Sequence, residues 1–163
     1  MIDTEAVYRD LYRIRKVEQR IIDIYPTDAI QSPVHLAIGH ESVAVAVSHG
    51  LRSYDTVFPY YRGHHWYLTR GGDLRRFWAE LFGKATGCCL GRGGSMHLCD
   101  KRAGVMGASA IVAPHLPNAA GYAWAQKLKA PKMRPSGAAD PVVYLLGPEP
   151  STSEDREDLH FVH

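Results

Sequence analysis

The chain has 163 residues, of which 45% are apolar and 22% are charged, a balance typical of one soluble globular domain. Its net charge is +2 with neutral histidines, which provides no strong field for nucleic acid or an anionic membrane. No apolar run approaches the length of a membrane span, and no basic segment followed by an apolar core opens the chain. We therefore expect neither secretion nor membrane insertion.

The three cysteines agree with a cytoplasmic location. Cys88, Cys89 and Cys99 cannot all pair with one another, and the adjacent pair has neither C-x-x-C nor zinc-knuckle spacing. We therefore expect reduced thiols in a cytoplasmic protein.

An amphipathic helix is predicted at the start of the chain. Apolar residues recur at steps of three and four from Val7 to Ile24, with Arg and Lys between them. Asp3 or Thr4 can cap this helix, and Pro26 ends it.

A helix of small residues is predicted over 41–50, with Gly50 as a left-handed C-cap. Residues 56–61 have the composition of a strand, which Pro59 restricts to a short or edge position. Residues 62–65 follow this strand directly. Loops at the carboxyl ends of strands are where open α/β sheets bind ligands, so this loop is a candidate site.

The next predicted helix covers 74–82, with Asp73 as its N-cap and Gly83 at its end. Its buried stripe is expected to consist of Phe77, Trp78 and Leu81.

Residues 91–97 then bring three glycines together with Ser95 and His97. Glycine lets backbone N–H groups approach an anion, so the neighbour of this segment is expected to be a polar group or a ligand. The alternative is a plain surface loop.

The last third of the chain predicts a short apolar element at 110–112 and a helix from Pro117 or Asn118 to Leu128. Residues 141–146 form a continuous apolar run typical of a buried parallel strand. Ser151 and Glu154 have the spacing of a capping box.

The alternation of helices and strands predicts an α/β fold with a doubly wound parallel sheet in a single domain, 1–163. So few strands leave an edge and a face uncovered, so the domain is expected to be incomplete. Either a partner completes the sheet, or the chain is part of a longer architecture.

Four segments resemble, in order and spacing, the amino-terminal half of the alpha subunit of thiamine-diphosphate-dependent 2-oxo acid dehydrogenases. This subunit belongs to the decarboxylating first component of pyruvate, branched-chain and acetoin dehydrogenase complexes. The segments are residues 34–41, 60–64, 79–97 and 107–112, and the resemblance spans Tyr8 to Leu146. It implies part of the doubly wound parallel sheet of the thiamine-diphosphate-binding fold.

The resemblance also implies a cofactor site. Tyr61 and Arg62 correspond to the pair that hydrogen-bonds the diphosphate, a role that suits a phenol and a guanidinium. The backbone of Ala110 and Val112 corresponds to the contacts with the aminopyrimidine ring.

Two histidines are implied to be catalytic. His35 and His64 correspond to histidines of the active-site channel, where imidazoles assist proton transfer and binding of the substrate carboxylate. The alternative for each is a structural polar group with satisfied hydrogen bonds.

No metal ligand is assigned to this chain. Where the family has an Asp that coordinates Mg²⁺ after the apolar strand, this sequence has Pro148, which has no side-chain oxygen. Glu149 stands where the family has a second glycine, and Glu149 or Asp155 is an open substitute for the ligand.

By resemblance, the expected function is oxidative decarboxylation of a 2-oxo acid, or the acetoin reaction, with acyl transfer to a lipoyl group. The implied cofactors are thiamine diphosphate and Mg²⁺. The implied partners are a beta-type subunit, a lipoyl-bearing acyltransferase and a missing carboxyl-terminal half. The alternative is a degenerate or truncated member that acts as a non-catalytic assembly or regulatory partner, and in either case we expect the lone chain to be inactive.

Overall fold

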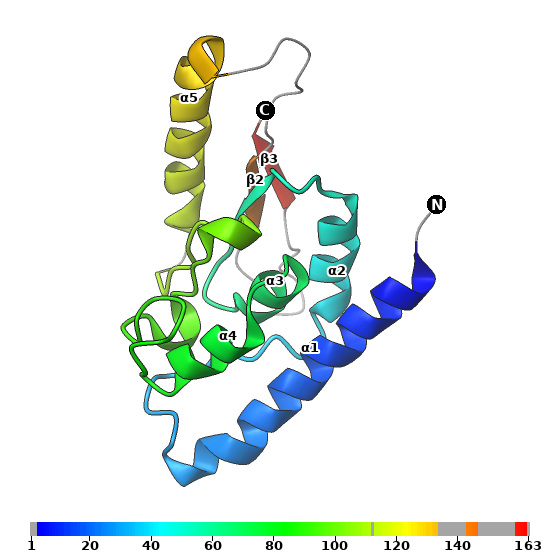
Figure 1. Cartoon of the computed structure of the whole chain (residues 1–163), viewed down its shortest axis with the longest axis vertical. Coiled ribbons are helices and arrows are strands. Elements are labelled where there is room, and N and C mark those ends of the chain that lie inside the picture. The colour runs from blue at the N-terminus through cyan, green and yellow to red at the C-terminus, as the bar shows by residue number, and fades with distance from the viewer. Residues whose placement is uncertain (1–2, 112, 134–142, 147–158, 163) are drawn as a thin grey trace.

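The computed structural model describes residues 3–111, 113–133, 143–146 and 159–162, and Figure 1 shows their arrangement. The described part is mostly helical, with one small sheet. The helices are α1 (Thr4–Ile24), α2 (Glu41–Gly50), α3 (His64–Thr69), α4 (Leu74–Leu81) and α5 (His115–Met133), and the strands are β1 (Thr56–Phe58), β2 (Val143–Leu146) and β3 (Leu159–Val162). Short 3-10 turns cover Tyr25–Thr27, Gly94–Met96 and Lys101–Ala103.

Helix α1 confirms the predicted cap and stop. The Asp3 carboxylate accepts a hydrogen bond from the Ala6 N–H at 3.1 Å, which satisfies one of the free amides of the first turn. The helix ends at Ile24, and Pro26 lies in the 3-10 turn that follows.

Helix α4 agrees with its prediction for the same reason. The Asp73 carboxylate accepts hydrogen bonds from the N–H groups of Arg75 and Arg76 at 2.7 and 2.9 Å. Gly83 follows the helix with φ +65°, a left-handed conformation that glycine adopts without strain. The buried face is only partly as expected, because Trp78 is half-buried.

Helix α2 corrects one expectation. Gly50 is its last helical residue, and the cap is Leu51 in an extended conformation, so the left-handed glycine cap was wrong. The Leu51 N–H donates to the carbonyls of Val47 and Ser48, which closes the helix without a positive φ.

The larger hydrophobic core lies between the four helices α1, α2, α3 and α4. Buried side chains from each of the four helices pack together there, with a contribution from the connecting segments. They are Ile14, Val17, Ile21, Ile30, Val45, Tyr67, Leu68, Phe77, Leu81 and Leu98.

The sheet has the order β1-β2-β3 and is mixed. Thr56 to Phe58 pair in parallel with Val143 to Leu145, whereas β2 and β3 are antiparallel, with Val143 opposite Val162. The expectation of an all-parallel sheet was therefore wrong at β3. Residues 147–158 separate β2 from β3 along the chain.

Helices lie on both sides of β1. Val57 packs into a cluster with Ala44 of α2 and Trp66 of α3. Phe58 points the other way, toward α5, and its ring lies 5.4 Å from that of Tyr122. Figure 1 shows the sheet between α5 and α2, with α1 crossing below.

Helix α5 starts earlier than predicted, at His115 instead of Pro117 or Asn118, and continues to Met133 instead of Leu128. Proline is tolerated in the first turn because its missing N–H would have no helical partner there. Among the described residues, no helix is both long and apolar enough to cross a membrane.

A second backbone segment lies along β1 and leads toward the candidate site. Residues 104–106 run parallel to the strand, with Val57 N–H bonded to Gly104 O at 2.8 Å and Met106 N–H to Val57 O at 3.0 Å. Residues 107–110 therefore leave at the carboxyl end of β1, where residues 59–63 also leave.

Candidate functional site

Tyr61 and Arg62 lie in the short connection between β1 and α3. The strand ends at Phe58, earlier than predicted, and both side chains are half-buried. The Arg62 Cζ lies 5.8 Å from the centroid of the Tyr61 ring. A phenol and a guanidinium thus stand together at the carboxyl end of the strand, where the sequence placed a ligand loop.

The segment around His35 contacts this pair. The rings of His35 and Tyr61 lie 4.8 Å apart at an interplanar angle of 58°. Arg62 Nη1 donates to the backbone carbonyl of Leu36. The structure therefore brings three of the predicted site residues, His35, Tyr61 and Arg62, into one cluster.

The segment before Ala110 lies against the start of α3. A Cβ built on Gly63 would meet the Ala108 Cβ at 3.2 Å, so the two backbones approach closely. Ala110 follows two residues later and is half-buried. The predicted apolar element is not a strand at Ala110 and Ile111, which lie in bends, and Val112 falls outside the described residues.

His64, which was expected in an active-site channel, lies in the interior of the described structure. Its side chain and that of Glu18 are 0% exposed. Nδ1 lies 2.9 Å from Glu18 Oε1, and Nε2 lies 2.7 Å from Ser95 Oγ. Both ring nitrogens are therefore occupied, and the histidine links α1, α3 and the glycine-rich segment.

The neighbouring His65 belongs to the loop 62–65 that the sequence indicated as a candidate site, although no role was assigned to it. Its ring is buried and lies 6.4 Å from that of Tyr60. Burial, together with the nearby His64, His40 and Arg62, lowers the pKa of His65 to about 3. The Arg62 guanidinium thus contributes positive charge at the start of α3, which suits an anion.

The glycine-rich segment binds an anion that belongs to the chain itself. Glu80 Oε1 accepts hydrogen bonds from the N–H groups of Gly93 and Gly94 at 2.7 and 3.2 Å, and Oε2 accepts from Cys89 and Gly91 at 2.7 and 2.9 Å. The expectation of a polar neighbour is confirmed, and that neighbour is the fully buried Glu80 carboxylate.

Glu80 and Glu18 are the residues that sequence reasoning missed, although a signal was present. Glu80 stands three residues after Phe77 and directly before Leu81, so it shares their buried helix face. Glu18 stands four residues after Ile14 on the apolar face of α1. A carboxylate on an apolar stripe indicates an internal hydrogen-bonding partner.

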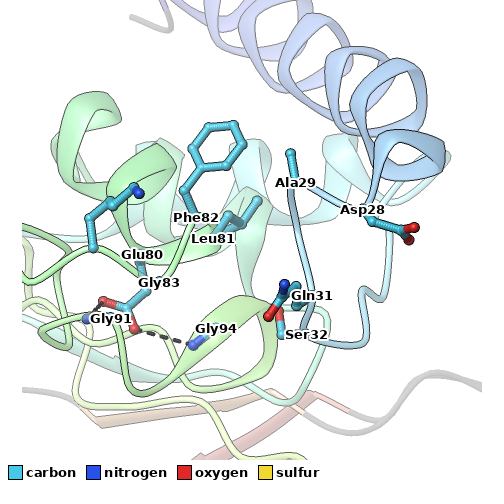
Figure 2. A pocket seen from close by; sticks show the side chains of 11 residues that line it. Asp28, Ala29, Gln31, Ser32, Glu80, Leu81, Phe82, Gly83, Gly91 and Gly94 are labelled. Atoms are coloured by element: carbon cyan, nitrogen blue, oxygen red, sulfur yellow. Dashed lines mark hydrogen bonds between the residues drawn. The ribbon is translucent and has the colours of Figure 1, made fainter.

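A pocket of about 460 Å³ borders Glu80 and the glycine-rich segment (Figure 2). Figure 2 shows the Glu80 carboxylate turned toward Gly91 and Gly94, with Gln31 and Ser32 beside the latter. None of the predicted site residues lines this pocket, so it is distinct from the cluster at the start of α3.

Comparison with known proteins gives one family match. The model of the dehydrogenase E1 component family matches residues 9–139. The segments that meet at the start of α3 all lie within this range.

Curated proteins give the same result. The chain is 38% identical over 126 residues to the alpha subunit of acetoin:2,6-dichlorophenolindophenol oxidoreductase of Bacillus subtilis, which covers 77% of the chain and 38% of that protein. It is 38% identical over 122 residues to the mitochondrial pyruvate dehydrogenase E1 component subunit alpha-1 of rice, Oryza sativa, which covers 75% of the chain and 31% of that protein. The match thus spans about a third of the length of these relatives.

Proposed function

Because the chain belongs to the dehydrogenase E1 component family, we propose that it provides the alpha-type part of a thiamine-diphosphate-dependent dehydrogenase acting on a 2-oxo acid or acetoin. The observation that carries the proposal is the convergence of three separate segments on the start of α3. Leu36 accepts from Arg62, Ala108 abuts Gly63, and Ser95 bonds His64.

Tyr61 and Arg62 are proposed to hold the diphosphate. Their donors fit such a group, because a guanidinium and a phenol O–H both bond phosphate oxygens. The Arg62 guanidinium, which also contributes to lowering the pKa of His65, supplies positive charge for the diphosphate. The backbone of Ala110 and Val112 is proposed to contact the aminopyrimidine ring.

His35 is proposed to face the substrate, since its ring lies against that of Tyr61. For His64 we propose a positioning role, because its ring is buried and both nitrogens are hydrogen-bonded. Thiamine diphosphate, when bound, supplies the electron sink that decarboxylation requires. The chain's own groups bind it and orient it.

The fold and the partners follow from the same proposal. We propose that the described sheet is part of a larger doubly wound parallel sheet, to which a missing carboxyl-terminal half contributes. A beta-type subunit and a lipoyl-bearing acyltransferase complete the reaction in this proposal. Pro148 stands at the position of the family's Mg²⁺ ligand and lies outside the described residues.

The test is reconstitution. The chain is combined with the carboxyl-terminal half of an alpha-type subunit, a beta-type subunit, thiamine diphosphate and Mg²⁺, and reduction of an artificial electron acceptor is followed with pyruvate, branched-chain 2-oxo acids and acetoin. We expect one substrate class to give turnover that requires all three chains. Absence of turnover with every substrate, while calorimetry shows that the three chains associate, would overturn the catalytic proposal.

Calorimetry of the chain alone is a second test. Without an Asp at position 148, the diphosphate lacks a bridging cation, so we expect weak or absent binding of Mg²⁺ and thiamine diphosphate. Tight Mg²⁺-dependent binding would show that Glu149 or Asp155 serves as the ligand.

A further inference from the structure

Two adjacent cysteines converge with a carboxylate at the start of the glycine-rich segment. The ligand atoms of Cys88, Cys89 and Glu80 all lie within 4.8 Å of one another. Within the described ranges, no other group of three His, Cys, Asp or Glu side chains gathers in this way. Both cysteines are free and half-buried.

The carboxylate of this group is fixed and already hydrogen-bonded. A carboxylate has about four acceptor positions, and four backbone N–H groups occupy those of Glu80. Glu80 therefore offers its negative charge at short range instead of a free oxygen. The two sulfurs are the groups that can form new bonds.

The described contact of the Cys89 sulfur can be replaced by a metal. The Cys89 thiol donates to the His97 carbonyl at 3.0 Å, and this bond is weak enough to be exchanged for a metal ligand.

We propose that Cys88 and Cys89 bind a thiophilic cation of the Zn²⁺ and Cd²⁺ type, with the buried Glu80 carboxylate balancing its charge. Each sulfur releases its proton and forms one bond to the ion, and water completes the coordination. Zinc–sulfur bonds of about 2.3 Å place two sulfurs on one ion roughly 4 Å apart. The two sulfurs lie within 4.8 Å of one another, which is close to that separation.

This site is independent of the proposed function. It shares no residue with the cluster of His35, Tyr61 and Arg62, so either assignment can fail without the other. Thiolates select soft cations over Mg²⁺, so Mg²⁺ is not expected to compete for it.

The chain provides its own control, Cys99. This cysteine is also free and half-buried, but its sulfur is not among the ligand atoms that gather within 4.8 Å. Binding of Zn²⁺ and Cd²⁺ to the reduced full chain is measured by competition with a chromogenic chelator. We expect Cys88→Ser and Cys89→Ser each to weaken binding by about tenfold or more, because half of the sulfur ligands are lost. Cys99→Ser should stay within about twofold of the parent chain.

A second measurement on the unmodified chain avoids any effect of substitution on folding. The chain is alkylated with iodoacetamide with and without Zn²⁺, and each cysteine is followed by mass spectrometry. Protection of Cys88 and Cys89 but not Cys99 is the expected result. Equal protection of all three cysteines, or equal metal affinity of the Cys88→Ser and Cys89→Ser variants and the parent chain, would overturn the proposal.

Discussion

His64 Nε2 lies 2.7 Å from Ser95 Oγ in the interior of the protein, and this contact connects α3 to the glycine-rich segment. Because Glu18 occupies the other ring nitrogen, removal of the hydroxyl leaves a buried nitrogen without a partner. We expect Ser95→Ala to lower the free energy of unfolding by about 1–3 kcal/mol in urea denaturation. Ser42→Ala, on the exposed face of α2, is the control and should change it by less than about 0.5 kcal/mol.

The second prediction concerns Glu80. Glu80→Gln removes the negative charge and points the side-chain NH₂ group at backbone N–H groups, which are themselves donors. We therefore expect the free energy of unfolding to fall by about 2–4 kcal/mol. Glu5→Gln is the matched control, because this carboxylate is 80% exposed and pairs with Arg9 at the surface. It should change stability by less than about 1 kcal/mol. Similar effects of the two variants in urea denaturation would show that the buried hydrogen bonds contribute little.

The third prediction concerns Arg62. In the complex with a beta-type subunit, Arg62→Lys keeps the charge but loses the forked geometry of the guanidinium. We expect the thiamine diphosphate concentration for half-maximal activity to rise about tenfold or more, since a charged hydrogen bond contributes about 1.5–3 kcal/mol. Arg9→Lys, on the surface of α1, should leave it unchanged. An unchanged cofactor dependence in Arg62→Ala would show that Arg62 has a structural role only.

The fourth prediction concerns pH. His65 has a folded-state pKa of about 3 against 6.5 for an unperturbed histidine, so between these values only the unfolded chain binds the proton. The contribution of neutral His65 to the free energy of unfolding is fully present above pH 6.5 and is lost as the pH falls toward 3. From pH 7 to pH 5 the loss amounts to about 2 kcal/mol.

The measurement is urea denaturation at both pH values. The groups that face His65 are His64, His40 and Arg62, and they remain in His65→Gln, so the difference between the two chains isolates His65. We expect the pH-dependent loss to be about 2 kcal/mol smaller in His65→Gln. His97→Gln removes an exposed histidine and should keep the slope of the parent chain.

Helices with a polar cap and a regular apolar stripe could be predicted from the sequence. Asp3 and Asp73 cap α1 and α4 as expected, because capping and periodicity are local properties. The strand β3 could not be predicted, since its pairing with β2 depends on contacts between distant parts of the chain. The start of α5 was misplaced because a proline in the first turn does not mark its boundary.

The candidate site was predicted unevenly for a similar reason. Tyr61, Arg62 and His35 lie together in the structure. They were found from the sequence because their segments resemble those of a known family in order and spacing. His64 was predicted by the same resemblance, but sequence spacing does not distinguish a ring that faces a channel from one that faces the interior. Its burial depends on Glu18, which comes from another helix.

The internal carboxylate under the glycine-rich segment has a consequence for how this part of the protein responds to its surroundings. The negative charge that the four amides around Glu80 bind comes from the chain itself. Because this carboxylate is buried, dissolved salt screens the interaction only weakly. The segment should therefore keep its shape across ionic strengths and with or without a bound phosphate. Recognition of an anionic ligand then falls to side chains such as Arg62, and only that recognition should weaken as salt increases.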